Sequence, residues 1–195
     1  MTTIITTASP SYATMFADQG ITSDLMQPDM GKIVQQGTWL IGVCGESRVC
    51  DLVQYVAKYP KVPESLISKK IEQWYPWIVT RVIPIIQKAV EENINKSSWS
   101  GLGDSEALLV THGHSFLIGE TLGLSKAEPY WGIGSGAQLA IGSLIGKSHN
   151  ADWNTKHAEY AKEAILAAEV HDPYTRGKVT GYKSLPSGRV SSIIT

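Results

Sequence analysis

The chain has 195 residues, 43% of them hydrophobic, and a formal net charge of -1 at pH 7. These values predict one globular domain over residues 1–195 and give no electrostatic case for nucleic acid or an anionic membrane as a partner. No run approaches the roughly 18 apolar residues of a membrane span, and no secretory signal is expected. Cys44 and Cys50 are interpreted as reduced thiols, so we expect a cytoplasmic protein.

The first half of the chain predicts short strands followed by helices. β-branched and aromatic residues dominate 3–7 and 11–18, on either side of a turn at Pro10, and KIVQQGTWLIGVCG predicts two more strands around Gly37. A helix is expected from Ser47 until the prolines of KYPKVP. A second helix follows over 78–90, where apolar residues recur every four positions, with a kink at Pro84.

The second half repeats this order. EALLVTHGHSFLIGE predicts a hairpin, PYWGIGSGAQLAIGSLIGK a strand leading into a small-residue helix, and WNTKHAEYAKEAILAAEVHD a second helix. KVTGYKS predicts a last strand, and residues 184–195 are expected to fray. Strands, two helices, strands, two helices and a final strand together predict an α+β fold with four layers, α-β-β-α, in which helix pairs flank two antiparallel sheets.

Two motifs invite other functions. GIGSGA at 132–137 fits the G-x-G-x-x-A form of a dinucleotide fingerprint, but it lies two-thirds along the chain after predicted hairpins, which favours a tight strand-to-helix turn. His112 and His114 lack further ligands at suitable spacing, so a hairpin turn is favoured over a zinc site. No G-x-S-x-G sequence indicates a Ser-His-Asp hydrolase.

The hydroxyl residues behind Met1 indicate a different chemistry. If Met1 is removed, Thr2 carries both a hydroxyl nucleophile and an α-amine that can act as its base, since the ordinary pKa of that amine is about 7.7 to 8.0. Such a site needs a cation to keep the amine neutral, a carboxylate to hold the cation, and a backbone N–H for the oxyanion. Lys32, Asp18 and Gly45 offer these groups.

Over nearly its whole length the chain resembles the proteasome β subunits, most of all the bacterial HslV-type subunit. The strings that carry the resemblance are TTIITT, FADQGIT, GKIV, GVCGESRVCD, IGSG and AAEVHDPYT, in the family's order. The resemblance implies the Ntn hydrolase fold and a threonine-type endopeptidase. It implies this catalytic set: Thr2 as nucleophile, Asp18 and Lys32 as the ion pair, Gly45 at the oxyanion, and Ser135 and Asp172 beside the terminal amine.

Three positions depart from the family pattern. Gly20 stands where a basic residue is usual, which predicts a looser hold on Asp18, Cys44 replaces an alanine, and Thr175 replaces a serine. None of these removes a reacting group.

The resemblance also implies how substrate and ions bind. An extended peptide would lie between the strand of Thr22 and the segment from Gly45 to Ser47, and Ile21 and Val43 would favour apolar side chains in the first pocket. No cofactor is needed for the chemistry. A structural Na or Mg ion is expected at backbone carbonyls after the last long helix, on Glu169, Asp172 and Thr175.

The family assembles as stacked hexameric or heptameric rings that receive unfolded polypeptides from an ATP-dependent unfoldase. Since no P-loop sequence occurs, the unfoldase would be a separate partner of this homo-oligomer. Two alternatives stay open: a non-catalytic ring or scaffold subunit of the same fold, and an amidase acting on a small molecule.

Overall fold

Two sheets form the centre of the molecule, which a computed structural model describes for residues 2–20, 31–94 and 101–193. Within these ranges all strand pairs are antiparallel, in the orders β10-β9-β2-β1-β8 and β3-β4-β5-β6-β7. The strands are β1 Thr3–Ser9, β2 Tyr12–Asp18, β3 Ile33–Gln36, β4 Trp39–Cys44, β5 Glu106–Thr111, β6 His114–Ile118, β7 Leu124–Lys126, β8 Tyr130–Gly134, β9 Val179–Ser184 and β10 Val190–Ile193.

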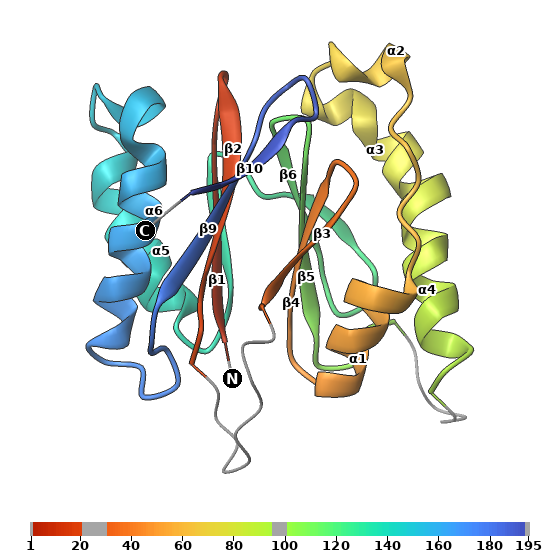
Figure 1. The fold of residues 1–195 in the computed structure, drawn as a ribbon, viewed down its shortest axis with the longest axis horizontal. Helices are drawn as coiled ribbons and strands as arrows, with labels where there is room; N and C mark the ends of the chain where they lie inside the picture. Colours follow the sequence, from red (N-terminus) through yellow and green to blue (C-terminus); the bar gives the residue numbers. More distant parts are fainter. Residues whose placement is uncertain (1, 21–30, 95–100, 194–195) are drawn as a thin grey trace.

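Helices cover the outer face of each sheet, which gives four layers (Figure 1). On one side lie α5 (Ala137–Ser148) and α6 (Trp153–Glu169), packed on β1 and its neighbours. The other side carries α1 (Ser47–Asp51), α2 (Glu64–Ile67), α3 (Tyr75–Trp77) and α4 (Ile83–Glu91). The predicted α+β sandwich of four layers is therefore confirmed.

The second helical layer is less regular than the sequence predicts. A π-helical segment, Leu52–Val56, extends α1, and another, Ile78–Val82, leads into α4. Helical backbone runs from Tyr75 through Ile78–Val82 into α4 without a break, and Pro84 is the second residue of α4, so its missing N–H falls directly after the π-helical segment. The kink expected at Pro84 stays a prediction.

Alternation along the strands builds three buried layers. In β1, Ile4 packs between the two sheets, whereas Ile5 packs under α5 and α6, because successive side chains leave a strand on opposite faces. A third cluster, with Trp39, Trp74 and Phe116 among its members, fills the space between the second sheet and α1–α4.

The expectation of a frayed tail from residue 184 is wrong as far as Ile193. Ser184 is fully buried at the end of β9, and the chain then turns at Gly188, which has a φ of +83°. β10 pairs with β9 from Val190 to Ile193, so it forms the edge of the first sheet. Backbone pairing with β9 orders this segment, with Val190 and Ile193 packed against two of the buried clusters, and composition does not reveal that pairing.

The GIGSGA segment joins β8 to α5 in an antiparallel sheet. A dinucleotide fingerprint belongs in a parallel βαβ unit, so the turn interpretation is confirmed. A hairpin turn is also what the structure places at His112 and Gly113, between β5 and β6. In the described ranges no helix combines the length and the apolar character needed to cross a membrane.

Candidate active site

Thr2 lies directly before β1, against the end of β8. The Ser135 N–H donates a hydrogen bond of 3.0 Å to the Thr2 carbonyl, which continues the pairing of β1 with β8. Gly134 makes this approach possible, because it has a φ of +94° and a Cβ there would lie 1.8 Å from the Thr2 oxygen. Thr2, at the start of the chain, and Ser135, 133 residues later, therefore lie side by side.

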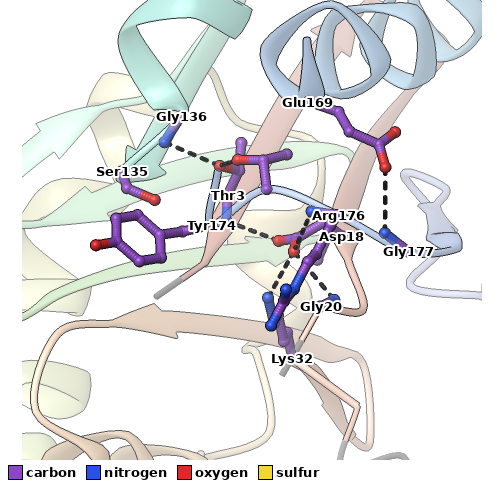
Figure 2. Close-up of polar contacts among 12 residues, drawn as sticks. Thr3, Asp18, Gly20, Lys32, Ser135, Gly136, Glu169, Tyr174, Arg176 and Gly177 are labelled. Carbon is purple, nitrogen blue, oxygen red and sulfur yellow. Dashed lines mark hydrogen bonds and ion pairs between the residues drawn. The ribbon is translucent and has the colours of Figure 1, made fainter. Parts of the chain in front are cut away.

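Asp18, at the end of β2, is 1% exposed and binds Lys32. Lys32 Nζ lies 2.8 Å from Asp18 Oδ2. Three backbone N–H groups also donate to this carboxylate, from Thr3 at 2.8 Å, Gly20 at 3.1 Å and Arg176 at 3.3 Å (Figure 2). The predicted looser hold on Asp18 is not observed, since the Gly20 N–H itself helps to hold it.

Burial sets the state of the Lys32 ammonium more than its partner does. Burial lowers the pKa of Lys32, Asp18 opposes that shift, and the positive charge of Arg176 adds to it. The net direction is downward. A lysine held in this way carries its charge next to the start of β1 and gives it up more easily than an exposed lysine.

A second carboxylate, Asp172, lies in the loop after α6 on the other side of Thr3. Its Oδ2 accepts hydrogen bonds from Ser135 Oγ at 2.7 Å and Thr175 Oγ1 at 2.6 Å, and the Tyr174 N–H donates to its Oδ1. Burial alone raises the pKa of Asp172, but these hydrogen bonds outweigh burial and the net pKa is lowered. Asp172 therefore stays a carboxylate that fixes the Ser135 hydroxyl.

The Thr3 hydroxyl ties this network to the strand. Thr3 Oγ1 lies 2.5 Å from Thr175 Oγ1 and accepts a bond of 3.0 Å from the Gly136 N–H. A Cβ at Gly136 would lie 2.4 to 2.9 Å from oxygens of Thr175, Thr3 and Asp172. Only glycine leaves room for the three side chains, which explains the second glycine of the GSG string.

The predicted oxyanion glycine lies in the turn between β4 and α1. Gly45 is exposed and has a φ of +116°, and a Cβ there would lie 2.4 Å from Ser105 Oγ. Ser105, which is fully buried, accepts a hydrogen bond of 3.0 Å from the Glu46 N–H and so fixes the following peptide. Burial raises the pKa of the neighbouring Cys44 to about 12, which keeps that thiol neutral.

The structure describes two of the four predicted substrate-binding residues, and these two differ in exposure. Ser47 is exposed at the start of α1, but Val43 is 4% exposed and belongs to the cluster under α1–α4. Ile21 and Thr22 lie outside the described residues.

The predicted ion site stays a prediction. Glu169 ends α6 and its carboxylate accepts the Gly177 N–H, while the carbonyl of Asp172 accepts the Thr175 N–H. No group of three or more His, Cys, Asp or Glu side chains in the described part of the chain is arranged to hold a metal. Any cation there would have to use backbone carbonyls.

Three residues of the site were not predicted from the sequence. Thr3 and Ser105 act through buried hydroxyl groups, and Arg176 acts through its backbone N–H and its charge. Buried hydroxyl groups leave no spacing pattern. For Arg176 one signal was available, since it follows the Asp172–Thr175 string directly.

Solved structures share this architecture, whereas neither the models of known protein families nor the curated proteins match the chain. A structure of Thiobacillus denitrificans BPH in complex with epoxomicin matches with a TM-score of 0.71 and 13% identity, over 94% of this chain and 98% of that one. A second structure of Thiobacillus denitrificans BPH matches with a TM-score of 0.67 and 12% identity, over 94% of this chain and 97% of that one. HslV from Trypanosoma brucei matches with a TM-score of 0.64 and 14% identity, over 94% of this chain and 99% of that one.

These matches define the class of fold. The chain has the Ntn hydrolase fold, in the form shared by HslV and BPH. The resemblance to proteasome-type subunits is confirmed at the level of the fold. At 12–14% identity the chemistry has to be argued from the residues of the site.

Proposed function

We propose that the chain is an N-terminal-threonine peptidase in which Thr2, after removal of Met1, is the nucleophile. The observation that carries this proposal is the meeting of two carboxylate networks at the start of β1. Asp18 binds Lys32 and the Thr3 N–H on one side, and Asp172 binds Ser135 on the other. An ordinary strand start needs neither network.

In the proposed reaction, the Thr2 hydroxyl attacks the carbonyl carbon of a peptide bond. Its proton passes, through a water, to the Thr2 α-amine, which the positive charge of Lys32 keeps neutral by like-charge repulsion. The oxyanion is stabilised by the Gly45 N–H, and the leaving amine takes a proton as the C–N bond breaks. An ester to Thr2 results, and water then hydrolyses it and restores the hydroxyl.

Ser135 and Asp172 would orient the amine and the water. Substrate would bind as an added strand along the segment from Gly45 to Ser47, with apolar side chains preferred before the cut. A panel of fluorogenic peptides that favours acidic residues there would contradict this specificity.

The assembly that we propose is a stacked homo-oligomeric ring of six or seven subunits in the cytoplasm, served by a separate ATP-dependent unfoldase. Enclosure would suit a site with little sequence preference. A stable monomer or dimer in solution would instead favour the small-molecule amidase.

The deciding experiment compares two forms of the chain, one made to begin at Thr2 and one that retains Met1, with intact mass as the check. Only the first is expected to hydrolyse a peptide substrate and to gain the mass of a threonine-directed covalent inhibitor. Thr2→Ser should keep part of the activity and Thr2→Ala should lose it. A form that begins at Thr2 and neither reacts nor turns over would favour the non-catalytic ring subunit.

A further inference from the structure

Arg176 follows the Asp172–Thr175 loop, and its side chain packs over Gly20. A Cβ at Gly20 would lie 2.4 Å from Arg176 Cγ and 2.8 Å from the Arg176 carbonyl oxygen. A Cβ atom essentially never lies within 3.0 Å of such an atom, so the stem of Arg176 occupies space that any side chain at position 20 would need. Figure 2 shows Arg176 beside Asp18, Gly20 and Lys32.

The contact brings two parts of the chain to one carboxylate oxygen. The N–H groups of Arg176 and of Gly20 both donate to Asp18 Oδ2, which also accepts from Lys32 Nζ. Arg176 is therefore fixed beside the ion pair by its own backbone, although its side chain is exposed. Its guanidinium is always charged, and this charge acts against the Lys32 ammonium, whose carboxylate partner also accepts the Arg176 N–H.

We propose that Arg176, seated over Gly20, is a positioning residue that sets the charge balance of the Asp18–Lys32 pair. The inference rests on the proposed function only for its effect on turnover. With the guanidinium in place, its positive charge repels the Lys32 ammonium, so Lys32 holds its proton less tightly. Without it, we expect the pKa of Lys32 to rise, because the positive charge of Arg176 repels the Lys32 ammonium.

The test measures the Lys32 pKa directly by competitive acetylation over a pH series, with mass spectrometry of the Lys32 peptide. Arg176→Met removes the charge and keeps most of the stem, and we expect the Lys32 pKa to rise by about half a unit or more. Arg176→Lys keeps the charge, so in this variant the Lys32 pKa should rise by no more than half as much as in Arg176→Met. Arg189→Met, at an exposed arginine in the turn before β10, should change nothing.

A second variant tests the packing. Gly20→Ala should displace the Arg176 stem and raise the Lys32 pKa in the wild-type chain, and it should add much less to that shift in an Arg176→Ala background. Additive shifts in the double variant would overturn the contact as the cause. Thermal melting of each variant separates this from loss of the fold.

The pH profile of peptide hydrolysis gives the readout in turnover. Arg176→Met also removes a positive charge from the site, so if the neutral Thr2 amine is the base its pKa should rise, and the acid limb of kcat/KM should move to higher pH and return in Arg176→Lys. An active enzyme in which neither the Lys32 pKa nor this limb moves overturns the inference. A chain that begins at Thr2 and hydrolyses nothing, yet shows the Lys32 shift, overturns the proposed function and leaves the charge coupling intact.

Discussion

Asp18 and Lys32 lie 2.8 Å apart, yet the two residues are held in very different ways. Asp18 is 1% exposed and accepts three backbone N–H groups in addition to the ammonium, from Thr3, Gly20 and Arg176. Lys32 is 13% exposed at its side chain and reaches the pair from the segment before β3. Asp18 is thus held by four donors from separate parts of the chain, whereas Lys32 is the more exposed member of the pair.

Asp18→Ala should therefore destabilise the fold more than Lys32→Met. The first change leaves three backbone donors and an ammonium without their acceptor, at about 3–5 kcal/mol, whereas the second leaves a carboxylate that three N–H groups still hold, at about 1–2 kcal/mol. Urea unfolding of both variants measures the difference.

Lys88→Met is the control, because Lys88 and Glu92 form an exposed pair at 3.8 Å whose loss should cost about 0.5 kcal/mol or less. Equal losses in Asp18→Ala and Lys32→Met would contradict the three backbone bonds as the main support of Asp18.

The turn at Gly45 gives a prediction about the oxyanion. Gly45→Ala should lower kcat/KM by about 100-fold or more, because the new Cβ would meet Ser105 Oγ and the Asp104 carbonyl within 2.5 Å at a φ of +116°. Ser105→Ala removes only the acceptor of the Glu46 N–H, so we expect roughly a tenfold loss with the fold kept.

Gly142→Ala is the matched glycine control. A Cβ at Gly142, within α5, meets nothing within 4 Å, so this change should leave activity alone and stabilise the helix by up to about 1 kcal/mol. Full activity in Gly45→Ala would sink the proposed role of this turn.

How much of this site could be predicted depends on what each residue contributes. Asp18, Lys32, Ser135 and Asp172 carry side chains whose chemistry and order resemble a known family, and the structure brings them together in two pairs around Thr3. β1 and β2 could be predicted from composition, because β-branched and aromatic residues dominate both segments.

What the sequence concealed are contacts made by the backbone or by small groups. β10 is ordered by main-chain pairing with β9, and the Gly20 and Arg176 N–H groups reach Asp18 whatever their side chains are. Ser105 is one buried hydroxyl among many serines, and its partner lies 59 residues away. Contacts of this kind depend on the assembled fold and not on a local pattern.

Asp172 gives a prediction about acid pH. Hydrogen bonds from Thr175 and Ser135 hold the pKa of Asp172 below its ordinary value against the effect of burial, so removing one of these hydroxyl groups must raise it. In Thr175→Val the carboxylate should take up its proton at higher pH, and peptide hydrolysis should fall at a higher pH on the acid side.

Thr175→Ser keeps the hydroxyl and should retain the wild-type profile. Both variants are assayed as kcat/KM against pH with a fluorogenic peptide. Identical acid limbs in the Val and Ser variants would show that the Asp172 proton does not govern turnover.

His157 gives a prediction about stability that does not involve the candidate site. It is fully buried in α6, its Nδ1 lies 2.8 Å from Thr7 Oγ1, and its Nε2 has no hydrogen-bond partner among the described residues. Burial, with a smaller contribution from the charge of Lys183, lowers the pKa of His157 from 6.5 to about 4. Between about pH 4 and pH 6.5 the imidazole of His157 is therefore neutral in the folded chain and protonated in the unfolded chain.

This difference in protonation makes the free energy of unfolding depend on pH. Between pH 6.5 and about 4 the unfolded state binds more protons than the folded state. The contribution of His157 to the free energy of unfolding is therefore fully present above pH 6.5 and is lost as the pH falls toward 4, by roughly 3 kcal/mol in total. His157→Asn should be less stable at neutral pH, because it loses packing against Tyr12, but its stability should depend less on pH across that window. His149→Asn, at an exposed position after α5, should keep the wild-type slope. Urea unfolding at half-unit steps of pH measures all three proteins, and a wild-type slope in His157→Asn would assign the acid sensitivity to other groups.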